Sequence, residues 1–84
     1  MEQKSKINEK LLEVLQLLGS NWSIQDYQLG GMGWTSVIVC ESRKYTLHSD
    51  RGCVEIYKGD YQEQRLIKSA ITANDIADII STNI

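Results

Sequence analysis

The first part of the chain carries apolar residues at helical spacing. Between Ser5 and Leu18 they recur at steps of three and four positions, with charged residues between them. This is the period of a helix with one apolar face. Ser5 can cap the first turn, and Gly19 stands where a residue with a positive φ angle would end the helix. The pattern predicts an N-terminal amphipathic helix over residues 5–18.

The middle of the chain changes to the period of a strand. Three segments are rich in β-branched and aromatic residues and are bounded by turn-forming residues, namely Trp34–Glu41, Lys44–His48 and Cys53–Tyr57. A fourth segment, Trp22–Leu29, alternates less regularly and precedes a glycine-rich turn at residues 30–33. Together they predict a four-stranded antiparallel meander.

Register decides which side chains share a face of this sheet, because a slip of one residue moves a whole strand to the other face. We expect two-residue turns at residues 42–43 and 50–51, and the first of them pairs Cys40 with Tyr45. This register collects the large apolar residues on one face, namely Trp34, Ile38, Cys40, Tyr45, Leu47, Val54 and Ile56. That face is therefore the predicted core.

The segment after the last predicted strand has features of a helix. Asp60 followed by Glu63 has the spacing of a capping box, and the residues after it are mostly good helix formers. A helix over residues 61–69 is therefore expected. The alternative is a strand over residues 65–71.

A second capping box, Thr72 followed by Asp75, precedes isoleucines at helical spacing. The pattern fits either two C-terminal helices or one long helix with a kink near Thr72. The predicted architecture is α+β, with an N-terminal helix, a four-stranded antiparallel meander and one or two C-terminal helices packed on one sheet face. The 84 residues are expected to form a single small domain.

Composition narrows the function classes. The hydrophobic fraction is 42% and the net charge is −2, which is typical of ordinary globular proteins and gives no general attraction to nucleic acid or to anionic lipid. No apolar run approaches the roughly 18 residues of a membrane span, and the charged N-terminus does not resemble a signal peptide. We therefore expect a cytoplasmic protein without a membrane role. A core this small would gain stability from a protein partner or from self-association.

The candidate chemistry is sparse. The single histidine, His48, faces Cys53 in the expected register, and a cysteine beside a histidine can form a reactive thiolate. Two unrelated residues on a solvated face are the commoner reason for such a pair. Cys40 falls on the opposite face, so neither a four-ligand zinc site nor a disulfide is expected. The sequence predicts no catalytic residues, no metal and no cofactor.

The second face of the predicted sheet is not fully polar, which suggests a contact surface. Regular pairing of the first strand would add Trp22 to this face, whereas a β-bulge near Gln25 or Asp26 would turn Trp22 and Ile24 into the core. The candidate binding residues are Trp22, Val37, Val39, Thr46, Tyr57 and Lys58.

These features favour a non-enzymatic protein-binding module, such as a small regulator or an inhibitor of a larger protein, with self-association as a further possibility. The alternative is an RNA- or DNA-binding domain that uses the basic residues Arg43, Lys44 and Lys58 at one end of the sheet. The element order resembles double-stranded-RNA-binding domains in outline, although acidic residues stand where such a domain needs a basic helix end. A thiol enzyme built on Cys53 and His48 is the third hypothesis.

Overall fold

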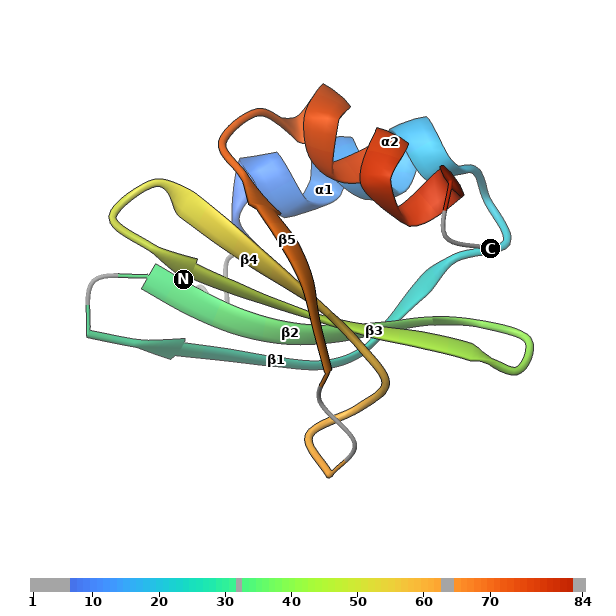
Figure 1. The fold of residues 1–84 in the computed structure, drawn as a ribbon, viewed down its shortest axis with the longest axis horizontal. Coiled ribbons are helices and arrows are strands. Elements are labelled where there is room, and N and C mark those ends of the chain that lie inside the picture. The colour runs from blue at the N-terminus through green and yellow to red at the C-terminus, as the bar shows by residue number, and fades with distance from the viewer. Residues whose placement is uncertain (1–6, 32, 63–64, 83–84) are drawn as a thin grey trace, which may run out of the picture.

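The structure is a computed structural model that describes residues 7–31, 33–62 and 65–82. Its elements are α1 (Glu9–Leu18), β1 (Ser23–Gly30), β2 (Gly33–Cys40), β3 (Arg43–Asp50), β4 (Cys53–Lys58), β5 (Arg65–Ala70) and α2 (Ala73–Thr82). The strands form one antiparallel sheet in the order β1-β2-β3-β4-β5, so each pairs with its neighbours in sequence. Both helices lie on the same side of this sheet (Figure 1).

The α+β class, the antiparallel sheet and a helix near each end of the chain are confirmed, but the sheet has five strands instead of four. The helix expected over residues 61–69 is wrong, because Arg65–Ala70 pairs with β4. Sheet pairing here overrides the helix propensity of a short polar segment. Asp60 does accept a hydrogen bond from the backbone N–H of Gln62, at 3.0 Å, but in a turn and not at the start of a helix.

Helix α1 begins later than expected and ends where expected. Its N-cap is Asn8, whose side-chain oxygen accepts from the backbone N–H of Lys10 at 2.8 Å, while Ser5 lies outside the described residues. Gly19 ends the helix with a φ of 118° and donates its N–H to the carbonyl oxygen of Leu15. Two residues of α1 are fully buried and belong to the core cluster, namely Leu11 and Val14.

Helix α2 is the only helix described after β4, and strand β5 precedes it. The C-terminal region therefore forms neither two helices nor one long kinked helix, but a strand followed by one helix. Thr72 caps it, because Thr72 Oγ1 accepts from the backbone N–H of Asp75 at 3.2 Å. The capping signal at this position is therefore confirmed. Ile76 and Ile80 of α2 are fully buried against the rest of the core.

The hairpin turns lie at residues 41–42 and 51–52, and the predicted pairs are wrong by two residues, since Cys40 pairs with Arg43 and not with Tyr45. Positive φ angles mark the turns, at 58° for Glu41 and 56° for Arg51. A shift of two residues leaves every side chain on its predicted face. The seven residues predicted to form the core are accordingly all buried.

The first strand contains the β-bulge that the sequence left open. Ile24 pairs with Ile38 and Asp26 pairs with Val37, so Gln25 is the extra residue. The bulge turns the segment before it toward the helices. Trp22, just before β1, is 8% exposed and belongs to the core, with its ring centroid 5.9 Å from that of Tyr45. Within residues 7–31, 33–62 and 65–82, neither helix has the length and apolar run that crossing a bilayer requires.

Candidate functional site

The helices cover one face of the sheet, and the other face carries no helix among residues 7–31, 33–62 and 65–82 (Figure 1). Side chains alternate between faces along a strand and antiparallel partners share a face, so the register assigns each residue to one of them. We call the helix-free side the open face. Its side chains include Asp26, Thr35, Val37, Val39, Thr46, His48, Cys53, Glu55, Tyr57 and Leu66.

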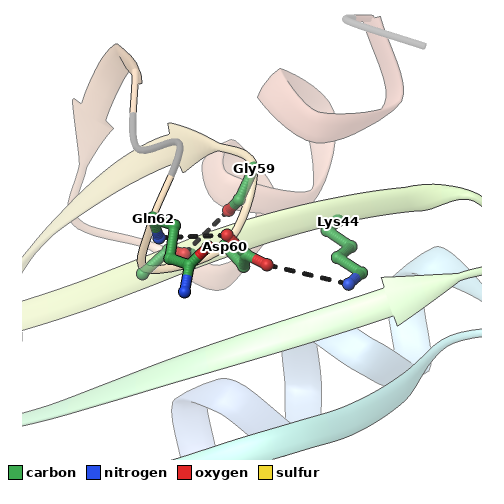
Figure 2. Close-up of polar contacts among 5 residues, drawn as sticks. Lys44, Gly59, Asp60 and Gln62 are labelled. Atoms are coloured by element: carbon green, nitrogen blue, oxygen red, sulfur yellow. Dashed lines mark hydrogen bonds and ion pairs between the residues drawn. The ribbon is translucent and has the colours of Figure 1, made fainter.

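The loop between β4 and β5 is fastened to strand β3 (Figure 2). Thr46 Oγ1 donates to the carbonyl oxygen of Gly59 at 2.8 Å, and the N–H of Gly59 donates to the carbonyl oxygen of Lys44 at 2.8 Å. The Lys44 ammonium also lies 3.7 Å from the Asp60 carboxylate. Gly59 has a φ of 97°, a conformation that favours glycine. These contacts hold the start of the loop against the sheet.

Tyr61 connects this loop to strand β1, which is two strands away from β3 in the sheet. Its hydroxyl donates to Asp26 Oδ2 at 2.7 Å, although β2 and β3 separate β4 from β1. Burial, followed by the hydrogen bond to Asp26 and the negative charge of that carboxylate, raises the pKa of Tyr61 to about 12. Val37 and Thr46 lie in the row between Asp26 and β4 and are 1% and 0% exposed. The loop therefore closes the middle of the open face.

Three of the predicted binding residues are corrected by this geometry. Val37 and Thr46 are on the expected face but are buried, because the β4–β5 loop passes over that face. Trp22 is in the core on the helix side of the sheet, because the extra residue Gln25 turns the side chains before it to the other face. None of the three presents a surface to a partner in this conformation.

The other predicted binding residues remain accessible to different extents. Val39 and Tyr57 are half-buried on the open face. Lys58 is exposed, but it pairs with Tyr45 and therefore belongs to the side of the sheet that carries the helices. Of the predicted set, Tyr57 is the aromatic residue that stays on the open face.

Two exposed residues absent from the predicted set lie on the same side of the sheet as Tyr57. Leu66 of β5 pairs with Tyr57 and is 57% exposed, and Tyr61 of the loop is 41% exposed. We call Tyr57, Tyr61 and Leu66 the open-face patch. The alternative strand over residues 65–71 was the signal for Leu66, since that strand would place it beside β4. Nothing in the sequence indicated that Tyr61 would reach Asp26.

A polar depression beside the patch is lined by Thr35, His48, Glu55 and Tyr57. Thr35 Oγ1 and His48 Nδ1 share a hydrogen bond of 2.8 Å, and the Tyr57 hydroxyl donates to Glu55 Oε1 at 2.8 Å. That hydrogen bond, followed by burial and the charge of Glu55, raises the pKa of Tyr57. Thr35 and His48 therefore form one hydrogen-bonded pair in this depression, and Tyr57 and Glu55 form a second.

The expected pairing of His48 with Cys53 is wrong. His48 pairs with Glu55 and Cys53 pairs with Asp50, because the turn between β3 and β4 lies one position later than predicted. Cys53 is an exposed free thiol and Cys40 a buried one. In the part of the chain that the structure describes, no three histidine, cysteine, aspartate or glutamate side chains gather as metal ligands would.

The basic residues expected at one end of the sheet do meet there. Arg43, Lys44 and Lys58 line one pocket together with Asp60. Two of them have other contacts, since Lys44 lies beside Asp60 and the Arg43 guanidinium lies 5.6 Å from the ring centroid of Trp22. Comparison of the chain with protein-family models, with curated proteins and with solved structures finds no match.

Proposed function

We propose that this chain is a protein-binding module that acts by contact with a larger protein and not by catalysis, and that its partner docks on the open-face patch. The observation that carries the proposal is the exposure of Leu66 and Tyr61, at 57% and 41%, beside half-buried Tyr57 on the face without helices. Adjacent exposed apolar side chains with polar neighbours are typical of interaction sites.

Hydrogen bonds hold both tyrosines of the open-face patch in one conformation before a partner binds. Tyr57 is held by its hydrogen bond to Glu55, and Tyr61 by its hydrogen bond to Asp26. Side chains already fixed in one conformation lose less freedom on binding, so more of the contact energy remains as affinity. Tyrosines of this kind often dominate the energy of an interface.

The proposal is tested by affinity capture from host lysate with three immobilised proteins: the unmodified chain, Leu66→Ser and Leu12→Ser. Leu12 is the matched control, because it is 48% exposed but lies on α1. We expect a protein that is retained by the unmodified chain and by Leu12→Ser and is lost with Leu66→Ser. Circular dichroism must show that all three baits are folded.

The captured protein is then purified and titrated calorimetrically against the chain. Tyr61→Ala is expected to raise the Kd at least about ten-fold, as the loss of a central aromatic anchor does. Equal retention by all three baits, or an unchanged Kd with Tyr61→Ala, would place the binding surface elsewhere and refute the proposal.

The pocket lined by Arg43, Lys44 and Lys58 favours a second candidate, binding of RNA or DNA at that end of the sheet. Phosphate contacts release counterions, so affinity would fall steeply with salt concentration. Retention on immobilised nucleic acid that declines with salt and is lost with Lys58→Glu would support this candidate. Retention that is absent at low salt would exclude it.

A further inference from the structure

Strand β5 is the outermost strand of the sheet on its side. It pairs with β4, and no second strand lies along its outer edge among the residues that the structure describes. An unpaired edge offers N–H and C=O groups to another strand. Leu66 on this strand and Ile71 just after it are 57% and 64% exposed. This edge is therefore an apolar and incompletely paired part of the surface.

A groove with acidic side chains runs between β5 and α2. Asp75 and Asp78 of α2 line it, together with Lys68 and Ala70 of β5 and Ile71 after it, so acidic side chains outnumber the basic one. Both carboxylates belong to exposed residues. A strand arriving at the edge of β5 would therefore bring its side chains close to two negative charges at this end, and a cationic side chain would be favoured there.

The residues of β5 suit pairing with another β5 in one antiparallel register. Arg65 and Ala70 lie on the helix side, because they pair with Lys58 and Val54, whereas Leu66 and Ser69 lie on the open face. Placing Arg65 opposite Ala70 of a second copy therefore puts Leu66 opposite Ser69, with matching faces. A slip of one residue would mismatch the faces.

The bulge in β5 does not disturb this register. The extra residue of the strand is Ile67, between Leu66 and Lys68. In the matched register Ile67 lies opposite Lys68 of the second copy, next to the two-fold axis. The bulges of the two copies then lie side by side at the two-fold axis. In the residue pairs on either side of the axis, both side chains still lie on the same face of the sheet.

We propose that two copies of this chain associate through β5, pairing antiparallel with Arg65 opposite Ala70, so that the two sheets become one. Arg65 of each copy then lies on the helix side at the end of the groove lined by Asp75 and Asp78 of the other. The two-fold axis repeats this contact, so the edge is complementary to itself in charge and in register.

The test uses sedimentation equilibrium on the full chain and on two charge reversals, Arg65→Asp and Asp78→Arg. We expect the unmodified chain to dimerise reversibly. Each reversal alone places like charges at both symmetric contacts and is expected to raise the dimer Kd at least about ten-fold. A mixture of the two variants should dimerise again, because both contacts between position 65 of one variant and position 78 of the other then join an acid to a base.

The matched control is Glu13→Lys, which reverses an exposed acidic charge on α1 and should leave the Kd unchanged. An unmodified chain that stays monomeric up to on the order of 1 mM overturns the proposal. A mixture of the two reversals that stays monomeric also overturns it. Tyr61 lies outside this edge, so Tyr61→Ala should not alter the dimer Kd. A chain that does not dimerise can therefore be told apart from a chain that does not bind a partner through the open-face patch.

Discussion

The hydrogen bond between Tyr61 and Asp26 joins parts of the chain that are far apart in sequence, since Tyr61 lies in the loop after β4 and Asp26 on β1, two strands that β2 and β3 separate. The phenol is the donor, so the contact depends on the neutral form of Tyr61. The carboxylate of Asp26 disfavours a second negative charge beside it. The protonation state of Tyr61 therefore decides whether this one link between the β4–β5 loop and β1 is kept.

Titration of Tyr61 should follow this dependence. Its pKa is raised from 10.0 to about 12, so the stabilisation by its neutral form is complete below pH 10 and is lost as the pH rises toward 12. Tyrosinate absorbance should show a step near pH 12 that is missing in Tyr61→Phe. A step that persists in Tyr61→Phe would assign the raised pKa to another tyrosine.

Gly33 should be intolerant of a side chain. A Cβ atom at this position would collide with the carbonyl oxygen of Ser49 on β3, whereas a Cβ at Gly30 meets open space. Gly33→Ala is therefore expected to lower the free energy of unfolding by about 1–3 kcal/mol, as overpacking does. Gly30→Ala is the matched control and should change it by less than about 0.5 kcal/mol. Urea denaturation of both variants measures the difference, and equal midpoints would contradict the close approach.

The two thiols should differ in reactivity, because Cys53 is exposed and Cys40 is buried. Iodoacetamide is expected to modify one cysteine in the folded protein and both in denaturant, since access limits the reaction. Intact mass counts the additions, and peptide mapping locates the first. Modification of Cys40 under native conditions would show that the core opens on the timescale of the reaction.

Among the elements, α1 is anchored by Leu11 and Val14, which are fully buried, while Leu15 is half-buried. Leu11→Ala is expected to cost about 2–5 kcal/mol, because the sheet and α2 cannot fill the cavity it leaves. Leu12→Ala, on the solvent side of the same helix, should cost less than about 0.5 kcal/mol. Thermal denaturation gives both values, and a similar cost for the two would mean that α1 does not pack as described.

The sequence predicted the faces of the central strands better than their partners. The alternation of Trp34, Ile38 and Cys40 fixed which side of β2 is apolar, and the structure buries all three. The turn positions were less certain, because neighbouring residues at each turn had comparable turn chemistry. The resulting error of two residues left the core prediction intact but produced a false partner for His48.

The errors that affected the binding site came from long-range structure. The spacing of Asp60 and Glu63 favoured a local helix, while the deciding interaction was the ladder between β5 and β4. The burial of Val37 and Thr46 depends on a loop that joins neither of their strands. The alternation of apolar and polar residues along a strand does not show which loop crosses above it. The open face was therefore predicted, but the β4–β5 loop that covers its middle was not.

At the scale of the whole molecule, one core joins both ends of the chain. Helices α1 and α2 lie on the same side of the sheet, and their buried residues belong to one cluster. This cluster also contains both tryptophans, Trp22 and Trp34. A core shared by every layer favours unfolding in a single step.

Unfolding in urea should therefore give the same midpoint by two methods. Tryptophan fluorescence reports the core around Trp22 and Trp34, and far-ultraviolet circular dichroism reports the helices and the sheet. Coincident curves are expected for a two-state transition. An earlier loss of the circular dichroism signal would show that the helices leave the sheet before the core around the tryptophans opens.

The strand order has a mechanical consequence. Each helix is connected to an edge strand, α1 to β1 and α2 to β5, and every strand pairs with its neighbours in sequence. Strands β1 and β5 point the same way, so the chain enters β1 at one end of the strand direction and leaves β5 at the other, and a force applied to the two ends would pull both edge strands partly along their own axes. Peeling needs less force than sliding paired strands past each other. The fold should therefore resist being pulled from its ends more strongly than a sheet whose edge strands are peeled away.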